Sequence, residues 1–416
     1  MKTPNIKIED ARRIAVYCQL LNGKKTSSKG EKNLIKIFDQ LGYIQIDTIS
    51  VVNRAHHHAL WTRSHDYTEE MLHHLQATDR KIYEYWGHAM SYLRMADFRY
   101  SLPRMEKFRN PKSPWAKTRI EKTKNIIGNV KKRIQDEGPL SSKDFENTSG
   151  KKGGTWWDWK PAKIALEIMY WQGELMVSER KKFQKYHDLT DRVLPENIDI
   201  SFPTEKESAW FIIHGALKSF GIASEKEIRN FMQPGSSRDS DFQLVNVKEI
   251  KKYLNELIEA GEIIKVKIED IDTDYFMLAK FEKLPENKNS AIRLLSPFDN
   301  LIIQRERTRQ LFGYDYSLEC YTLEPKRKFG YFVFPILYGN KLVGRLDPKA
   351  DRKNKILILK NLVFEPTFKV SVKFLNLFSA ELKQFAVFNN CEKIIIEKCP
   401  NQKMKKELEL KFKPDF

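Results

Sequence analysis

The sequence contains little cysteine and no long apolar run. Its 416 residues include four cysteines, and none of them forms a C-x-x-C pair, so neither a zinc ribbon nor a disulfide framework is indicated. The amino-terminal residues lack the apolar core of a signal peptide. The longest apolar run, residues 331–338, is too short to cross a bilayer. We therefore expect a protein of the reducing cytoplasm that has no membrane partner.

Several motifs of nucleotide, metal and hydrolase chemistry are also missing. No G-x-x-x-x-G-K-[ST] loop, no strand-borne G-x-G-x-x-G and no serine nucleophile elbow occurs, so nucleotide hydrolysis is not indicated. Most of the nine histidines precede residue 90, but adjacent histidines point apart and no H-E-x-x-H is present. No carboxylate cluster suits a metal-dependent nuclease. We expect neither a metal nor another cofactor.

Positive charge is abundant. The chain has 73 Lys and Arg against 55 Asp and Glu, a net charge of +18, which favours a polyanion as partner, most commonly nucleic acid. One strongly basic tract covers residues 101–133 and includes Trp115. Both a solvated helical face and a phosphate-binding surface fit this tract.

One succession of elements is predicted twice. In each copy a helix ends at glycine, a serine-containing turn leads into a short helix, a longer helix follows, and a hairpin begins with Gly-Glu and aliphatic residues. The first copy has helices at 118–137, 143–145 and 160–172, with strands at 174–178 and 183–187. The second has helices at 205–220, 225–231 and 247–260, with strands at 262–266 and 274–278. This order is typical of the winged helix-turn-helix, and two copies are harder to explain by chance than one.

The ends of the chain differ from the repeated part. Residues 8–21 and 30–41 have helical periodicity, a strand is predicted at 43–49, and further helices are predicted at 67–75 and 80–100. We expect a third, diverged winged helix there. From about residue 290, short apolar runs separated by turns predict an antiparallel sheet with a helix at 371–388. The predicted class is α+β, with domains at 1–114, 115–200, 201–284 and 285–416.

The strand predicted at 43–49 carries a polar pair. Gln45 and Asp47 share one face because side chains alternate along a strand, and they are about 7 Å apart at roughly 3.4 Å per residue. Taken alone, an exposed strand face with ordinary polar residues explains the pair better than a functional site does, because a single Gln-x-Asp is a weak signal.

Motifs along nearly the whole chain favour a functional site over an ordinary polar strand face. The tract 44–49, then Arg54-Ala55-His56 and Glu84-Tyr85-Trp86-x-His88, resembles the bacterial winged-helix DNA glycosylases of the YcaQ/AlkZ type. The tract 295–299 with Arg305, the pair Lys326-Arg327, and the tract 344–352 are similar to that family too. The resemblance implies three tandem winged helices and a β-rich part around an open C-shaped cleft.

The resemblance also implies an activity, namely excision of N7-alkylated purines and unhooking of interstrand crosslinks made by bifunctional alkylators. The Gln-x-Asp pair is similar to that of the branch with broader substrates. In this interpretation Asp47 offsets the developing sugar cation and acts as general base, and Gln45 holds the water. The expected partner is double-stranded DNA bearing alkylated purines or crosslinks, bound by a nucleoid-associated monomer. The residues expected to contact this DNA are Arg54, His56, Trp86, His88, Arg305, Lys326, Arg327, Lys328, Lys349 and Arg352.

A second class of function stays open. Winged helices alone favour a non-catalytic transcriptional regulator, since most of them only bind duplex DNA. A regulator usually needs a dimer or a ligand domain for specificity, and the sequence indicates neither. The lack of a lysine beside Gln45 and Asp47 favours a monofunctional glycosylase over a lyase.

Overall fold

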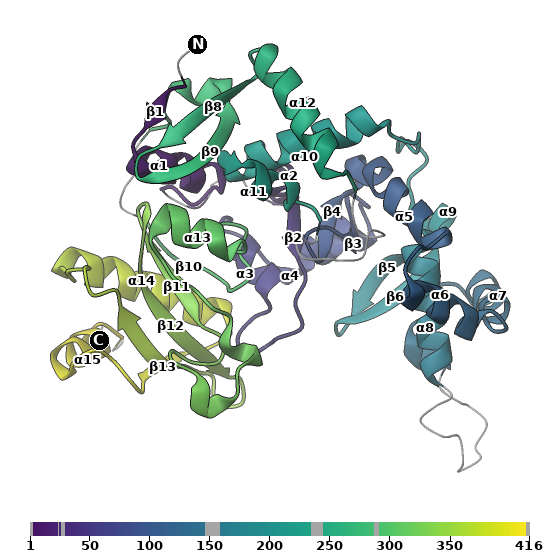
Figure 1. Cartoon of the computed structure of the whole chain (residues 1–416). Coiled ribbons are helices and arrows are strands. Elements are labelled where there is room, and N and C mark those ends of the chain that lie inside the picture. Colours follow the sequence, from purple (N-terminus) through teal and green to yellow (C-terminus); the bar gives the residue numbers. More distant parts are fainter. Residues whose placement is uncertain are drawn as a thin grey trace. The chain divides into compact units, whose positions relative to one another are not determined.

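The chain folds into two compact units of mixed helices and strands (Figure 1). The computed structural model describes residues 3–23, 25, 30–145, 159–233, 244–286 and 291–412. The first unit comprises Met1–Thr68, Ala216–Glu227 and Ile258–Phe416, and the second comprises Glu69–Gly215 and Ile228–Leu257. The predicted segment 201–284 contributes residues to both units, so the compact units do not follow the four predicted domains.

A four-stranded sheet lies in the first unit. Its order is β1-β8-β9-β7, with β1 (Asn5–Ile6), β8 (Ile263–Ile268), β9 (Ile271–Leu278) and β7 (Ile222–Ser224). β8 and β9 form the predicted hairpin, and Val266 stands opposite Tyr275, both fully buried. The two-residue strand β1, which the sequence did not predict, pairs with β8 in parallel.

A five-stranded sheet forms most of the carboxy-terminal part of this unit. Its order is β10-β11-β12-β13-β14, with β10 (Ile292–Leu294), β11 (Phe334–Tyr338), β12 (Lys341–Asp351), β13 (Ile356–Phe364) and β14 (Lys393–Ile396). The predicted antiparallel pairing is confirmed except at β14, which runs parallel to β13. Between these two strands lies α14 (Val372–Phe388), because parallel neighbours need a long crossover. α14 packs against β10 (Figure 1), and α15 (Gln402–Phe412) follows β14.

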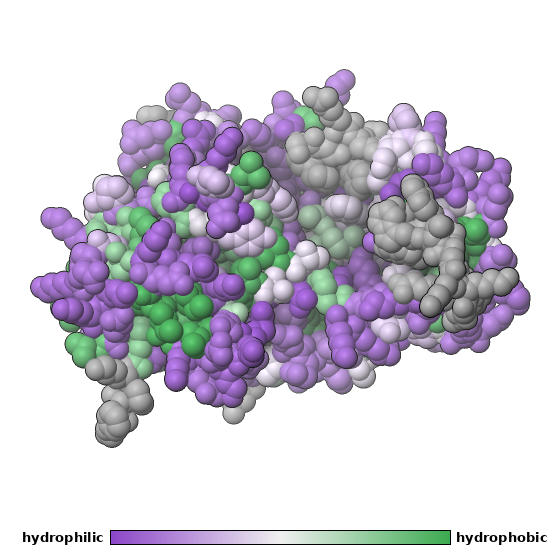
Figure 2. All heavy atoms as spheres, turned by 90° about the horizontal axis from the view of Figure 1, so that it is seen from below, coloured by the Kyte–Doolittle hydropathy of each residue, from purple (hydrophilic) through white to green (hydrophobic). Residues whose placement is uncertain are grey.

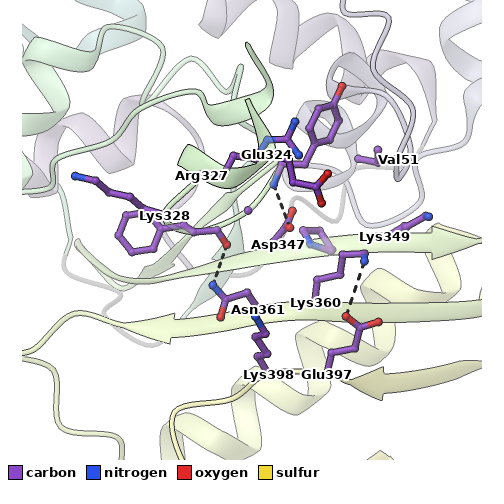
Figure 3. Close-up of a pocket in the computed structure, with 14 residues that line it drawn as sticks. Val51, Glu324, Arg327, Lys328, Asp347, Lys349, Lys360, Asn361, Glu397 and Lys398 are labelled. Carbon is purple, nitrogen blue, oxygen red and sulfur yellow. Dashed lines mark hydrogen bonds and ion pairs between the residues drawn. The ribbon is translucent and has the colours of Figure 1, made fainter. Parts of the chain in front are cut away.

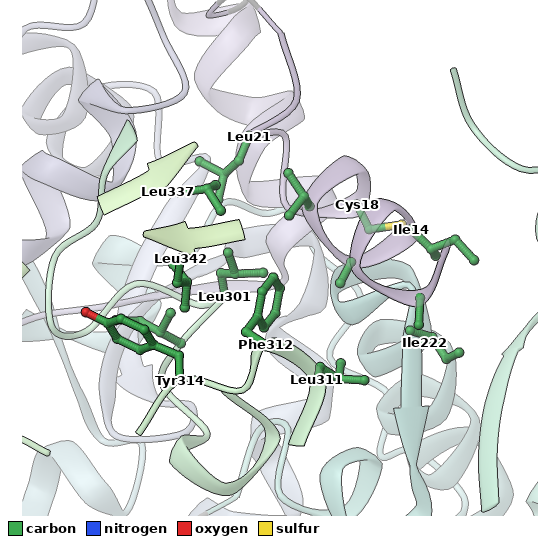
Figure 4. Close-up of a cluster of buried hydrophobic side chains, with 14 of the residues drawn as sticks. Ile14, Cys18, Leu21, Ile222, Leu301, Leu311, Phe312, Tyr314, Leu337 and Leu342 are labelled. Carbon is green, nitrogen blue, oxygen red and sulfur yellow. The ribbon is translucent and has the colours of Figure 1, made fainter. Parts of the chain in front are cut away.

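The two sheets and the amino-terminal helix share one hydrophobic core. α1 (Ile8–Cys18) presents buried side chains at helical spacing, including Ile14 and Cys18, which lie near Ile222 of β7 (Figure 4). α13 (Arg305–Phe312) adds Leu311 and Phe312. The other short elements of this unit are α2 (Glu31–Leu41), β2 (Tyr43–Gln45), α3 (Ala55–Trp61), η4 (Ala279–Glu282), η5 (Glu319–Tyr321) and η6 (Glu324–Lys326).

The second unit is mainly helical and contains two hairpins. Its elements are α4 (Glu69–Ala77), β3 (Ile82–Trp86), β4 (Met90–Arg94), η1 (Met95–Ser101), α5 (Leu102–Arg109), α6 (Pro114–Thr123), α7 (Ile127–Glu137), η2 (Ser142–Phe145), α8 (Trp159–Trp171), β5 (Leu175–Lys181), β6 (Gln184–Leu189) and α9 (Thr190–Val193). Three helices have residues in both units, namely α10 (Glu205–Phe220), α11 (Glu225–Arg229) and α12 (Val247–Glu259).

Two helix predictions in this unit are wrong. Residues 80–100 form the β3–β4 hairpin and η1 rather than a helix. The first strand is rich in aromatic and β-branched side chains that are buried on both faces, a pattern that periodicity does not separate from a buried helix. The helix predicted at 118–137 is two helices, because α6 ends at Thr123 and α7 begins at Ile127.

The repeated succession of elements is present at both predicted places. α7, η2, α8 and the β5–β6 hairpin follow one another, and Leu140 bridges to His187 of β6. α10, β7, α11, α12 and the β8–β9 hairpin form the second succession, in which β7 pairs with β9. None of the described helices is long and apolar enough to span a membrane.

Candidate functional site

The strand that carries Gln45 is shorter than predicted. β2 ends at Gln45, and residues 46–50 have no regular secondary structure. Ile44 and Ile46 are buried while Gln45 and Asp47 are half-buried, so the predicted alternation holds as far as Asp47. There the Asp47 carboxylate accepts the N–H of Ile49 at 2.8 Å. Such a local turn gives the backbone an alternative to the sheet ladder, which is why the strand stops.

The loop after Asp47 is fixed to the carboxy-terminal part of the same unit. Ala350 of β12 donates its N–H to the carbonyl of Val51 at 2.8 Å, and Arg352 donates to the carbonyl of Val52 at 3.1 Å. Asn53 donates its N–H to the Asn389 side-chain oxygen and its side-chain NH₂ to the carbonyl of Phe388, both at 2.7 Å. These contacts position the backbone that follows Asp47.

A buried ion pair lies next to the residue that contacts β2. Asp299 accepts two hydrogen bonds from the Arg63 guanidinium, at 2.7 and 3.0 Å, and both side chains are 0% exposed. The neighbouring Asn300 donates its side-chain NH₂ to the carbonyl of Tyr43 at 3.0 Å. The residue that directly follows the motif at 295–299 therefore contacts the strand that carries Gln45.

Asp47 is more basic than a solvated carboxylate. Burial raises its pKa above the ordinary 3.8, and the backbone N–H groups of Ile49 and Thr48 and the charge of Arg54 oppose this. The charge of Asp47 in turn adds to the burial that raises the pKa of Cys320 and of Tyr321. Arg54, Cys320 and Tyr321 therefore lie within the electrostatic reach of Asp47. A carboxylate with a raised pKa suits general base catalysis.

A cavity of about 450 Å³ opens beside the same loop (Figure 3). Val51 lies on its wall, together with residues of η6, β12, β13 and the segments that follow η6 and β14. Two of its carboxylates are engaged, because Asp347 accepts the N–H groups of Tyr331 and Phe332, both at 3.1 Å, and Glu397 lies 3.8 Å from Lys360. The other charged side chains that line the cavity are Glu324, Arg327, Lys328, Lys349 and Lys398.

Cations therefore outnumber anions at this cavity, as expected of a site for phosphate groups. Lys326, Lys328, Lys349 and Arg352 are exposed, whereas Arg327 is half-buried, donates to the carbonyl of Thr322 at 2.9 Å and lies over Tyr331. The basic segment at 326–328 begins at the last residue of η6 and is not the turn of a β-hairpin. Lys349 lies within β12, and the turn of the β12–β13 hairpin begins after Asp351.

Two residues predicted to contact DNA have other surroundings. His56 is 1% exposed, so its side chain is enclosed by the protein and not presented at the surface. Arg305 donates to the carbonyls of Ile302 and Pro297 at 2.7 and 2.5 Å and lies over Tyr316, so it holds the loop before α13.

Trp86 and His88 belong to the second unit. Trp86 lines a cavity of about 300 Å³ there, together with Tyr170, Trp171 and Lys185. A ring nitrogen of His88 is hydrogen-bonded to the carbonyl of Asn230 at 3.2 Å. The cavity beside Trp86 is thus lined by aromatic and basic side chains. Figure 2 shows one face of the molecule, on which hydrophilic side chains predominate.

Sequence reasoning missed the segment at 319–323. Cys320 and Tyr321 are more than 270 positions away from Asp47 along the chain, and no local pattern marks them as its neighbours. Only the tertiary fold brings η5 to the electrostatic environment of this carboxylate.

The fold and the site together define a basic protein of mixed helices and sheets with a carboxylate of raised pKa. The family model described as DNA glycosylase AlkZ-like matches residues 38–388, and the chain belongs to this family of DNA glycosylases. The structure is also similar to that of Streptomyces sahachiroi DNA glycosylase AlkZ, with a TM-score of 0.62 and 13% identity over 95% of this chain and 100% of that chain. At this identity the likeness concerns the fold.

Proposed function

We propose that this glycosylase hydrolyses the N-glycosidic bond of N7-alkylated purines in double-stranded DNA, including purines held in interstrand crosslinks. The observation that carries the proposal is Asp47, a half-buried carboxylate with a raised pKa, two residues after Gln45 in a chain of the AlkZ-like family. We propose further that the enzyme is a monofunctional hydrolase that forms no covalent intermediate.

The departing base needs no acid catalysis. N7-alkylation makes the purine cationic, so the base departs with the electron pair of its glycosidic bond and becomes neutral without protonation. The sugar then develops oxocarbenium character, which the negative charge of Asp47 offsets. Asp47 takes a proton from water as the water oxygen bonds to C1′, and Gln45 orients that water through its amide. General base catalysis of this kind contributes about 10²–10⁴ in rate.

Arg54 has a supporting role in this scheme. Its charge lowers the pKa of Asp47 and so opposes the effect of burial. Asp47 must be ionised to accept a proton, and Arg54 favours that state without removing the basicity that burial confers.

We propose that the two repeated successions of elements are winged helix-turn-helix modules that bind the duplex, and that α1, α2 and β2 belong to a third, diverged module. The element order and the pairing of β7 with β9 support this. The cations around the 450 Å³ cavity would then neutralise phosphates near the lesion.

An excision assay tests the proposal. The protein is incubated without metal with duplex containing N7-methylguanine or a nitrogen-mustard crosslink, and the DNA is then treated with alkali. We expect strand breaks only after alkali, and a loss of about 10²–10⁴ in rate for Asp47→Asn with DNA affinity retained. Asp272→Asn, which changes an exposed carboxylate of β9, is the matched control and should behave like the wild type. Excision by Asp47→Asn at the wild-type rate would refute the mechanism.

The same assay separates the alternatives. Breaks without alkali would indicate a nuclease or a lyase. Duplex binding without any damage-dependent break would indicate a non-catalytic regulator.

A further inference from the structure

Two large hydrophobic side chains are exposed at the end of η5 and just before η6. Tyr321 is 80% exposed and Leu323 is 72% exposed, although burial of such side chains is strongly favourable. Single exposed hydrophobic residues are common on protein surfaces. These two differ because they are separated by one residue, and because Tyr321 lies within the electrostatic reach of Asp47.

The segment that carries them is held in one conformation. The carboxylate of Glu319, itself buried, accepts the N–H groups of Lys328, Phe329 and Gly330 at 3.1, 2.9 and 3.0 Å. Between these ends, Thr322 donates its N–H to the carbonyl of Glu319 at 2.9 Å and accepts from the Arg327 guanidinium. Tyr321 and Leu323 therefore project from a closed loop whose ends are tied together.

Gly330 shows how closely this loop packs. A Cβ atom at Gly330 would lie 2.1 Å from a carboxylate oxygen of Asp347, far inside contact distance. The same carboxylate accepts the N–H of Tyr331. The loop is therefore anchored on β12 as well as on Glu319.

The segment that follows the projecting pair is basic, because Glu324 is its one carboxylate beside Lys326, Arg327 and Lys328. Lys326 and Lys328 are exposed, and Arg327 and Lys328 line the cavity beside the loop of Asp47. Within the part of the chain that the structure describes, no ion pair involves Lys326 or Lys328. An apolar tip flanked by cations is complementary to duplex DNA, whose base stack is apolar and whose edges carry phosphates.

We propose that Tyr321 and Leu323 form a wedge that enters the base stack of duplex DNA next to the nucleotide being excised. Lys326 and Lys328 would contact the flanking phosphates and fix the depth of entry. Such a wedge unstacks one base step and opens the sugar of the target nucleotide to Asp47 and its water. The inference rests on the proposed function, because it takes the reacting sugar to lie at Asp47.

A protein partner fits this feature less well. Specific protein interfaces bury roughly 800 Å² on each partner, and two side chains followed by a basic segment do not provide such a surface. The charge of the surroundings favours DNA.

Unstacking can be measured without catalysis. A duplex carrying 2-aminopurine beside N7-methylguanine, with a 2′-fluoro sugar that stabilises the glycosidic bond, is saturated with the Asp47→Asn protein. We expect 2-aminopurine fluorescence to rise, and most of this rise to disappear when Leu323→Ala or Tyr321→Ala is added to Asp47→Asn. Leu410→Ala is the matched control, since Leu410 of α15 is 64% exposed, and it should leave the rise unchanged. An equal rise in the Leu323→Ala and Tyr321→Ala proteins would overturn the wedge.

Excision rates then separate this inference from the proposed function. With the natural sugar, we expect Leu323→Ala to slow single-turnover excision by roughly 10- to 100-fold, since misplacement of a reacting group costs up to about 10² in rate. If the wild type excises and Leu323→Ala is equally fast, the wedge is refuted and the function stands. If the wild type does not excise, the proposed function is refuted, and the fluorescence result still decides whether the pair unstacks DNA.

Discussion

The surroundings of Asp47 favour its neutral form more than water does. Burial raises its pKa, and a group whose pKa in the folded protein exceeds its unfolded value binds its proton more tightly in the folded state. Its contribution to stability is therefore complete below the unfolded pKa and is lost as the pH rises through the folded pKa. At neutral pH the ionised carboxylate is retained for the reaction and not for stability.

This linkage predicts a separation of stability from activity. We expect Asp47→Asn to have an unfolding free energy at pH 7 equal to or above that of the wild type, with the difference shrinking towards pH 3.8, the ordinary Asp value. Chemical denaturation at several pH values measures it. A variant that is much less stable at pH 7 would show that the carboxylate is structural.

Excision should also depend on pH. Because Asp47 acts when ionised, the single-turnover rate should fall as the pH is lowered through the raised pKa of Asp47, at a pH above that expected for a solvated aspartate. The residual activity of Asp47→Asn should lack this limb. The same acidic limb in both proteins would assign the titration to another group.

Arg63 and Asp299, unlike Asp47, are buried charges that we expect to contribute to the stability of the fold. Both side chains are inaccessible to solvent, so removal of one leaves the other uncompensated. We expect Asp299→Ala to lower the unfolding free energy by about 3–5 kcal/mol. Urea denaturation measures this, and Asp272→Asn serves again as the exposed control. A loss below 1 kcal/mol, the range of exposed pairs, would mean that the pair is solvated.

At the scale of elements, two glycines at helix ends allow a matched comparison. Gly221 ends α10 and Gly261 follows α12, with φ of +74° and +72°. A Cβ atom at Gly221 would lie 2.7 Å from Ile14 and 2.8 Å from Cys18 of α1, whereas a Cβ atom at Gly261 would meet nothing within 4 Å.

Replacement of each glycine by alanine should therefore differ in cost. Gly261→Ala should lose only the left-handed backbone preference, about 1–2 kcal/mol. Gly221→Ala should lose this and a further steric contribution, because α1 must move away from β7. Thermal and urea denaturation of the two proteins would test it, and equal losses would show that α1 accommodates the methyl group freely.

Most helices could be predicted from the sequence and several strands could not. α1, α2 and α12 bury residues at three- and four-residue spacing, and this period is visible in the sequence. β1 has only two residues and pairs with β8, more than 250 residues away, so no local signal marks it. The β3–β4 hairpin was mistaken for a helix because β3 is buried on both faces and does not alternate.

At the scale of the whole molecule, the net charge of +18 predicts that DNA binding is driven by the release of counterions from the DNA. We expect the logarithm of the binding constant to fall linearly with the logarithm of salt concentration, and each phosphate contact to contribute about 0.9 to the slope. Lys328→Gln with Lys349→Gln should reduce the slope by nearly two such contacts, since both lysines line the cavity near Asp47. Lys403→Gln with Lys406→Gln changes exposed lysines of α15 and is the control. Equal slopes for the two double variants would place the DNA elsewhere.

The candidate site could be predicted only in part, because its residues come from segments that are distant in sequence. Gln45 and Asp47 are close in sequence, so their pairing on one stretch of backbone was visible. The neighbours of Asp47 come from distant segments, as Cys320 and Tyr321 show. Exposure of Tyr321 and burial of His56 follow from tertiary packing, which composition and spacing do not report.

The anchoring of the loop after Asp47 has a consequence for the order of folding. Its partners are Ala350, Arg352, Phe388 and Asn389, about 300 residues downstream. A ribosome releases these partners long after the loop itself, and contacts so distant in sequence form late because the intervening chain must first be ordered. The backbone behind Asp47 is thus set only after residue 389 has left the ribosome, and a shorter nascent chain does not yet carry a finished reaction centre.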